Sequence, residues 1–194
     1  MDAFPHLQSA RLELREIVPA DAPALFAIHS DVDAMRWFGT DPLSDITQAE
    51  KLVETFASWR KTPNPGTRWA IVERGGHQLL GTCGLFKWNR AWKSCTLGYE
   101  LSRSARGKGF MHEALSSVLA WGFEHMALNR IEAQIHPEND ASIRLATRLG
   151  FVPEGRLREA GFWLGAHRDL IQFSLLRAEY LSARLPSPQV QPAR

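Results

Sequence analysis

The chain has 194 residues, enough for one domain with a well-developed core, and 44% of them are hydrophobic, as in ordinary globular proteins. Lysine and arginine total 23 against 21 acidic residues, and the net charge of +2 excludes a strong electrostatic preference for nucleic acid. No run of residues is long and apolar enough to span a bilayer, so we expect no membrane partner.

The chain start and the cysteines indicate a reducing compartment. Residues 1–6 lack a basic region followed by an apolar run, so we do not expect a signal peptide. Cys83 and Cys95 do not form a Cys-x-x-Cys pair, which predicts buried free thiols and no metal site. We therefore expect a cytoplasmic protein with a single domain over residues 1–185 and a disordered, proline-rich tail over residues 186–194.

The N-terminal part of the chain predicts one strand followed by helices. Residues 11–17 alternate between apolar and polar side chains, as in a half-buried strand. Asp21 is the expected N-cap of the first helix, with Pro23 in its first turn. The expected helical segments are residues 21–30, 31–38 and 47–59, the last capped by Ser44 or Asp45.

The rest of the chain predicts a mixed sheet. Three antiparallel strands precede the segment Arg106–Met111, and the helix after it crosses over to a parallel strand. The expected elements are strands at residues 69–73, 79–86 and 95–101, a helix ending near Ala127, a strand at 130–136, a helix at 141–149 stopped by Gly150, an extended segment at 151–157 and a strand at 168–177.

The segment Arg106–Met111 joins a predicted strand to a predicted helix through a glycine-rich turn. Such a junction presents free backbone N–H groups and the positive end of a helix dipole, and Gly107 and Gly109 permit close approach. Arg106 and Lys108 add positive charge, so the turn is expected to bind phosphate oxygens. A nucleotide-triphosphatase loop is excluded, because Lys108 is followed by glycine and not by a hydroxyl residue.

Four motifs together resemble the GNAT superfamily of N-acetyltransferases, and within it the RimJ/RimL-like branch of ribosomal-protein Nα-acetyltransferases. They are Leu97-Gly98-Tyr99-Glu100-Leu101, Arg106 to Ala114, Asn139 to Arg144, and Leu149-Gly150-Phe151. The similarity covers about Gln8 to Tyr180. Arg106 and Gly109 fit the superfamily pattern Arg/Gln-x-x-Gly-x-Gly/Ala, whereas Met111 replaces its last small residue.

The resemblance implies an α/β (α+β mixed) fold with a mostly antiparallel central sheet flanked by helices. It also implies a bulge in the strand before the glycine-rich turn, a splayed strand pair at the CoA site, and acetyl-CoA as donor. The implied cofactor-binding residues are Leu101, Ser102, Arg103, Arg106, Gly107, Lys108, Gly109, Phe110, Met111, Asn139, Ser142 and Arg144, with Arg148 a further candidate for the nucleotide phosphates.

The catalytic roles implied by the resemblance leave alternatives open. Ser142 is the candidate acid, or a helix residue that satisfies nearby backbone. Relatives often carry a glutamate base where this chain has Thr96, so Glu100 or His136 is the candidate base. The non-catalytic alternatives are a solvated carboxylate at the sheet edge for Glu100 and a structural role for His136. Water would then be the base. The tyrosine acid of some relatives falls at Ala146, so that route is closed.

The implied reaction is direct transfer of an acetyl group to a primary amine, of a protein N-terminus or a small molecule, in a ternary complex. A different class of function, a catalytically silent acyl-CoA-binding sensor or interaction module, stays open, as does a homodimer. The expected substrate-pocket residues are Trp37, Phe38, Phe86, Trp88, Tyr99, Glu100 and Trp163.

Overall fold

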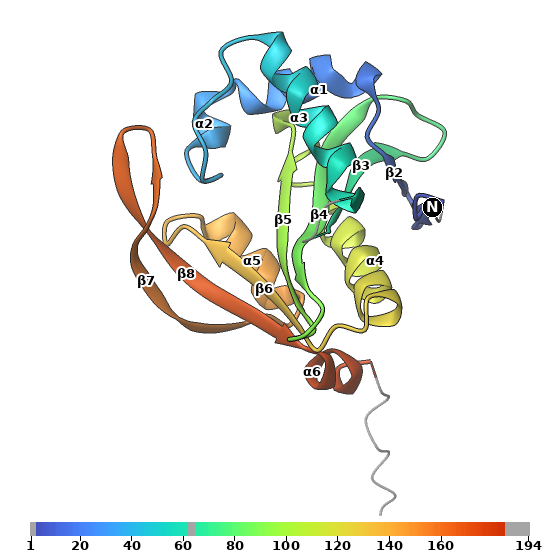
Figure 1. Cartoon of the computed structure of the whole chain (residues 1–194), viewed down its shortest axis with the longest axis vertical. Coiled ribbons are helices and arrows are strands. Elements are labelled where there is room, and N and C mark those ends of the chain that lie inside the picture. The colour runs from blue at the N-terminus through green and yellow to red at the C-terminus, as the bar shows by residue number, and fades with distance from the viewer. Residues whose placement is uncertain (1–2, 62–64, 185–194) are drawn as a thin grey trace, which may run out of the picture.

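The structure is a computed structural model that describes residues 3–61 and 65–184 (Figure 1). Its strands are β1 (Leu7–Gln8), β2 (Leu12–Glu16), β3 (Thr67–Glu73), β4 (Leu79–Asn89), β5 (Ser94–Leu101), β6 (Arg130–Ile135), β7 (Val152–Trp163) and β8 (Ala166–Leu176). Its α-helices are α1 (Ala22–His29), α2 (Val32–Met35), α3 (Ile46–Ser58), α4 (Phe110–His125), α5 (Asp140–Arg148) and α6 (Arg177–Ser182). Short 3-10 helices are η1 (Pro19–Asp21), η2 (Trp59–Lys61) and η3 (Arg103–Ala105).

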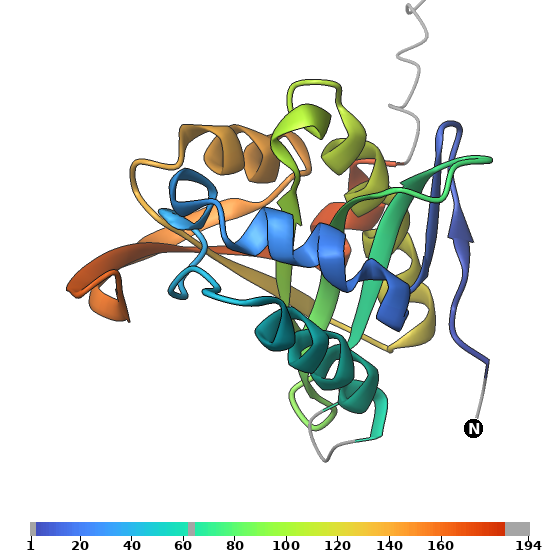
Figure 2. The same ribbon diagram turned by 90° about the horizontal axis from the view of Figure 1, so that it is seen from above.

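The described strands form one sheet in the order β1-β2-β3-β4-β5-β6-β8-β7. Neighbouring strands are antiparallel, except that β5 and β6 run parallel, with α4 as the connection between them (Figure 1). The expected mixed, mostly antiparallel sheet flanked by helices is therefore confirmed. The β7–β8 hairpin projects from the rest of the protein (Figure 2).

Two hydrophobic cores cover the two faces of the sheet. The larger core packs α4, through residues such as Leu115 and Leu119, against β2 to β6 and β8. The smaller core packs Leu25 of α1 and Val53 of α3 against Ala70 of β3. Because side chains alternate along a strand, β3 serves both cores, and its first six residues are all buried. Packing against β3 holds α1 and α3, the helices on the second face, beside the end of β5.

Local sequence signals account for most helix ends. Asp45 caps α3, with its carboxylate accepting from the Thr47 N–H at 2.8 Å. Gly150 follows α5 at φ 91°, in the left-handed region that glycine adopts readily. Asp21 precedes α1, but its predicted capping bond is absent; its carboxylate instead binds Arg15 at 2.8 Å.

Other predictions differ from the structure at element ends. Strand β1 and helix α6 were not expected, since both are too short to show a clear periodicity. Strand β7 continues to Trp163 because it pairs with β8 to the hairpin turn. Cys83 and Cys95 are buried free thiols, as predicted. The predicted tail, 186–194, lies outside the described residues. None of the described helices has the length and apolar character needed to cross a membrane.

Candidate active site

The site begins where β5 and β6 separate. The two strands pair only at residues 94–96 and 130–132. Beyond Thr96, β5 continues beside β4, whereas β6 continues beside β8 to Ile135, so the expected splayed pair is present (Figure 1). The bulge expected in β5 is wrong, because the register of β5 with β4 is unbroken from Thr96 to Leu101.

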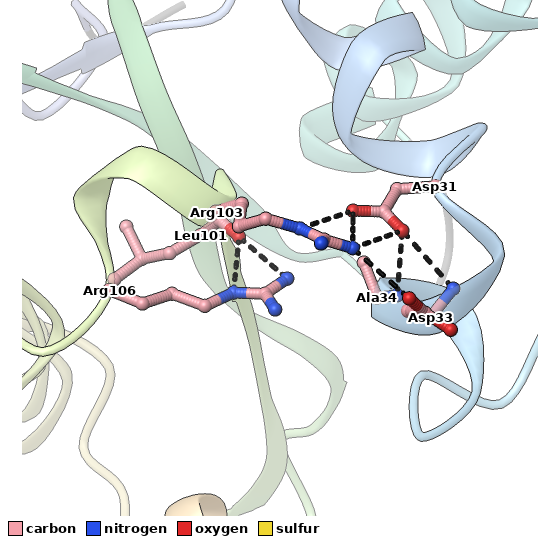
Figure 3. Close-up of polar contacts among 6 residues, drawn as sticks. All are labelled: Asp31, Asp33, Ala34, Leu101, Arg103 and Arg106. Carbon is pink, nitrogen blue, oxygen red and sulfur yellow. Dashed lines mark hydrogen bonds and ion pairs between the residues drawn. The ribbon is translucent and has the colours of Figure 1, made fainter.

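Backbone groups of β5 point into this gap. Ser102, just after β5, donates its N–H to the Leu80 carbonyl of β4, at 2.8 Å. Because successive residues of a strand direct their backbone groups to opposite sides, the N–H groups of Tyr99 and Leu101 point away from β4. The Leu101 carbonyl accepts from Nε and Nη2 of Arg106, at 3.3 and 3.2 Å (Figure 3). The gap therefore presents backbone N–H donors beside a guanidinium group.

The turn between β5 and α4 has the shape of an anion cradle. Gly107 and Gly109 have φ angles of 74° and 78°, in the left-handed region that other residues adopt only with strain. Helix α4 begins at Phe110, and its N-cap glycine supplies no capping side chain. The first N–H groups of α4 and the positive end of its dipole therefore face the cavity lined by Gly109 and Phe110.

A cavity of about 880 Å³ runs from this turn past the gap to the segment after α2. Its volume is typical of a site for a cofactor-sized ligand. Thirteen of the predicted site residues line it: Trp37, Phe38, Tyr99, Glu100, Leu101, Arg106, Gly107, Gly109, Phe110, Met111, Asn139, Ser142 and Arg144. Predicted site residues from four separate parts of the chain are thus brought to one cavity.

Three predicted cofactor residues lie beside this cavity and do not line it. The guanidinium of Arg103 binds the carboxylates of Asp31 and Asp33 at 3.1 and 3.2 Å (Figure 3). The side chain of Lys108 is exposed, and its carbonyl accepts from Arg11 at 3.1 Å. Ser102 Oγ lies 3.4 Å from Ser104 Oγ. The charge of Arg103 is therefore paired with Asp31 and Asp33, whereas Lys108 is exposed at the turn.

Three predicted pocket aromatics also lie outside the cavity lining. Phe86 packs on Trp59, with ring centroids 5.2 Å apart. Trp88 lies below the Arg90 guanidinium near Asn89, which pairs with Ser94 at the end of β5 remote from the site. Trp163 is buried and donates its Nε1–H to the Arg36 carbonyl at 3.0 Å. The rings of these three residues pack within the fold and do not line the main cavity, so their pocket role stays a prediction.

Glu100 lies in a buried polar network and not at a solvated edge. Its carboxylate accepts from Arg68 Nη2 and from the Thr82 hydroxyl, while Arg68 Nε donates to Thr82 Oγ1 at 2.7 Å. His29 Nε2 lies 3.4 Å from Glu100 Oε1. Burial opposes the charged form, but Arg68, His29 and Thr82 together hold the pKa of Glu100 below its usual value. A carboxylate so stabilised as an anion is a poor general base, and it is not a solvated edge group. Glu100 does line the cavity, so its place in the substrate pocket stays a prediction.

His136 is packed between aromatic rings behind the cavity wall. Its ring lies 4.5 Å from that of Trp37 and 6.0 Å from that of Trp163, by their centroids. Its Nδ1 accepts the Glu138 N–H at 3.1 Å, so that lone pair is already in use. Burial lowers the pKa of His136, with Arg168 and Arg36 acting in the same direction. This geometry favours the structural role over the base.

Ser142 and Asn139 meet at the start of α5. The Asn139 carboxamide oxygen accepts the Ser142 N–H at 3.1 Å and caps the helix. The Ser142 hydroxyl is therefore not the group that caps α5. Burial raises the pKa of Tyr99, and the neighbouring Ser142 hydroxyl partly lowers it, so two hydroxyl groups lie together on the cavity wall.

The cavity lining also holds charged residues from several elements. Arg148, the further candidate for the nucleotide phosphates, lines the cavity together with Arg106 and Arg144. Asp33 and Glu138 line the cavity as well, with exposed side chains. The sequence motifs did not indicate these two acidic residues, because Asp33 lies within α2 and Glu138 follows β6, and only the fold brings them together. Charge is thus divided between a basic and an acidic set of lining residues.

Comparison with known proteins decides what this arrangement is. Residues 11–152 match a family model described as an acetyltransferase (GNAT) domain. An uncharacterized N-acetyltransferase of Bacillus subtilis, YoaA, is 34% identical over 174 residues, which cover 90% of this chain and 98% of YoaA. The chain belongs to the GNAT acetyltransferase family. As a GNAT protein it is an N-acetyltransferase that uses acetyl-CoA, which confirms the predicted family, enzyme class and cofactor.

Solved structures share the GNAT fold. The structure of spermidine N-acetyltransferase from Vibrio cholerae in complex with CoA and spermine has a TM-score of 0.76 at 23% identity, covering 88% of this chain and 98% of that one. RimL, a ribosomal L7/L12 alpha-N-protein acetyltransferase solved with coenzyme A, has a TM-score of 0.78 at 19% identity, covering 89% and 98%. Both likenesses, at 23% and 19% identity, show the shared fold.

The residues present fit CoA. Two left-handed glycines and a helix start without a capping side chain suit a diphosphate group. The gap between β5 and β6 offers backbone donors to an amide-containing arm. The arginine group of Arg106, Arg144 and Arg148 supplies positive charge at the same end.

Proposed function

We propose that this enzyme transfers the acetyl group directly to a primary amine, of a peptide N-terminus or a small molecule, which enters opposite the glycine-rich turn. The observation that carries the proposal is the continuity of the cavity. It joins the turn at Gly109 to the rings of Trp37 and Phe38 through the gap beside β5. A donor and an acceptor can therefore meet in the gap without leaving the protein.

In this proposal the chain holds the donor at three places. The N–H groups of Gly107, Gly109, Phe110 and Met111 bind the pyrophosphate, with charge from the arginine group. The gap binds the pantetheine arm, beside Asn139. When bound, acetyl-CoA supplies the acetyl group as a thioester. Residues of the chain must then polarise the thioester oxygen and assist the departure of the thiol.

The N–H groups of Tyr99 and Leu101 are the proposed donors to the thioester oxygen. They point into the gap from a strand that is paired along its other edge, so they are fixed before the reaction begins. A preorganised donor of this kind contributes about 3 kcal/mol to transition-state stabilisation. The leaving thiol has a pKa of about 8.5, so a hydroxyl donor is sufficient to assist its departure. We assign this to Ser142, with the Tyr99 hydroxyl beside it.

The amine is proposed to lose its proton to water. Glu100 is held as an anion by Arg68, and His136 Nδ1 accepts a backbone N–H, so neither is prepared to take a proton. The cavity end near Asp33 and Glu138 is open enough for solvent to serve. In that case the pH dependence of kcat/KM should follow the pKa of the acceptor amine itself.

The acceptor end favours a cationic amine. Asp31, Asp33 and Glu138 carry three negative charges there, against the positive charges of Arg36 and Arg103. The related structures were named for acetylation of spermidine and of a ribosomal protein, and both kinds of acceptor carry amines. We therefore retain the peptide N-terminus and the small amine as acceptors.

The test is mass spectrometry of cell extract incubated with the enzyme and isotope-labelled acetyl-CoA, followed by thiol release with the amines found. Labelled amines that also support turnover would establish the acceptor. Tight CoA binding without turnover on any amine would instead support the silent acyl-CoA-binding module. A cytoplasmic location and a homodimer remain part of the proposal, to be checked by fractionation and light scattering.

Replacing Ser142 by alanine should lower kcat at least tenfold while the Kd for CoA changes little, because the hydroxyl is assigned to thiol departure and not to binding. Steady-state kinetics and calorimetry measure the two quantities. Ser116 is the matched control, since its hydroxyl donates to the His112 carbonyl at 2.8 Å within α4 and Ser116 does not line the main cavity. Equal kcat values for wild type and Ser142→Ala would remove Ser142 as the acid.

A further inference from the structure

We propose that Arg11 and Glu113 are positioning residues that hold the glycine-rich turn in the form that binds the CoA pyrophosphate. This inference rests on the pyrophosphate site proposed above. The two residues are 102 positions apart, and neither is among the residues expected to bind the cofactor. We call the pair, with Ser9, the turn clasp.

Arg11 contacts the turn on both sides of Gly109. Its Nη1 donates to the Lys108 carbonyl at 3.1 Å, and its guanidinium lies 4.7 Å from the centre of the Phe110 ring. A Cβ atom added at Gly109 would lie 3.5 Å from Arg11 Nη2. The side chain is half exposed, so its contacts are not those of a core residue.

Glu113 fixes Arg11 from the first turn of α4. Its Oε2 binds Nε and Nη2 of Arg11 at 2.8 and 2.7 Å. Its Oε1 accepts the Arg11 backbone N–H and the Ser9 hydroxyl, both at 2.7 Å. Burial opposes its charged form, but the bonds from Ser9 and Arg11 hold the pKa of Glu113 below its usual value. The carboxylate is therefore an anion near neutral pH, and its charge is matched by Arg11.

Peptide geometry relates the clasp to phosphate binding. The peptide unit between Lys108 and Gly109 is planar and trans, so its C=O and N–H point in opposite directions. When Arg11 holds the Lys108 carbonyl, the Gly109 N–H is fixed on the other side, away from Arg11. Two left-handed glycines make the free turn flexible, so a side chain that selects one orientation reduces the entropy lost when the anion binds.

Charge adds a second effect of the clasp. Glu113 lies one turn of helix after the anion-binding N–H groups, where an unpaired carboxylate would repel a diphosphate. Arg11 neutralises it and leaves the field of the helix start favourable. Loss of Arg11 therefore makes the turn more flexible and leaves the Glu113 carboxylate without its cation.

The experiment compares Kd values for CoA and for dephospho-CoA, which lacks only the 3′-phosphate, by calorimetry on the full chain. Arg11→Met should weaken both ligands by about tenfold or more and by the same factor, because both carry the pyrophosphate. The double variant Arg11→Met/Glu113→Gln should recover part of the affinity, because the uncovered charge is gone. A loss confined to CoA would overturn the inference, since Arg11 would then contact the 3′-phosphate directly.

The control is Arg15→Met, four residues further along the chain and within β2. Arg15 binds the Asp21 carboxylate through two bonds of 2.8 Å, in η1 beyond the far end of β2. This variant should lose stability and keep the CoA affinity of the wild type. Unchanged CoA affinity in Arg11→Met would overturn the clasp, provided that a Gly109 variant loses affinity. If the Gly109 variant also bound CoA normally, the proposed pyrophosphate site itself would be wrong.

Discussion

Replacement of Arg68 by methionine should lower the free energy of unfolding by about 3–5 kcal/mol, because it leaves the Glu100 carboxylate buried without its cation. Both side chains are almost fully buried, at 4% and 8% exposure, so water cannot substitute for the lost partner. Urea denaturation followed by tryptophan fluorescence measures the change. This is the largest stability effect that we expect from a single polar substitution in the chain.

The double variant Arg68→Met/Glu100→Gln supplies the internal control. Removing both charges abolishes the uncompensated carboxylate, so most of the lost stability should return. Arg156→Met removes a partner from the exposed Arg156–Asp169 pair and should change stability little. If Arg68→Met were as stable as the wild type, the buried network would not be the support for β5 that the structure describes.

The difference in stability between the wild type and Arg68→Met should change with pH in a defined direction. The pKa of Glu100 is lowered in the folded protein from its ordinary value of 4.5, so its contribution to stability is complete above that pH. The contribution is lost as the pH falls through the folded pKa. The difference between wild type and Arg68→Met should therefore be largest near neutral pH and shrink below about pH 4.5. A difference that grew on acidification would contradict the assignment of Glu100 as the anion.

Replacement of Gly109 by leucine should raise the Kd for CoA about 100-fold, equivalent to about 2.7 kcal/mol of binding free energy. A Cβ atom there would lie 3.5 Å from Arg11 Nη2, and a φ of 78° is strained for any residue with a Cβ atom. A leucine should therefore shift the backbone of the turn and displace the N–H groups assigned to the diphosphate. Calorimetric titration with CoA measures the loss. The variant should also be destabilised, since the strain is present without ligand.

The variant Gly75→Leu distinguishes the effect of backbone strain from the effect of a side chain at the CoA site. Gly75 has a φ of 75°, almost the same as Gly109, and a Cβ atom there meets nothing within 4 Å. It lies in the turn between β3 and β4, outside the cavity lining. Both variants should lose similar stability, whereas only Gly109→Leu should lose CoA affinity. Equal CoA affinities in the two variants would place the pyrophosphate elsewhere.

The parts of the site that were predictable depend on neighbours in sequence. The turn from Gly107 to Gly109, the helix start at Phe110 and the pair Asn139 and Ser142 each occupy one short segment. Their geometry follows from backbone preferences and capping within a few residues. The motifs therefore indicated the donor site and the fold before any contact between distant segments was known.

The roles that were wrong depend on partners far along the chain. Glu100 appeared to be a free carboxylate, because Arg68, Thr82 and His29 lie 18 to 71 positions away and come from other elements. His136 appeared to be a candidate base until its Nδ1 was found beside the Glu138 N–H. In each case the chemistry of the side chain is set by what packs against it.

By itself, the sequence determined the family, the donor and the turn that accommodates its diphosphate, since these depend on local conformation. Only the tertiary structure decided which charged side chains are paired with other residues of the protein. It matched Glu100 with Arg68, and Glu113 with Arg11 across 102 residues. The physical reason is that the pKa and the availability of a side chain depend on burial and on distances to other elements, and no spacing along the chain encodes them.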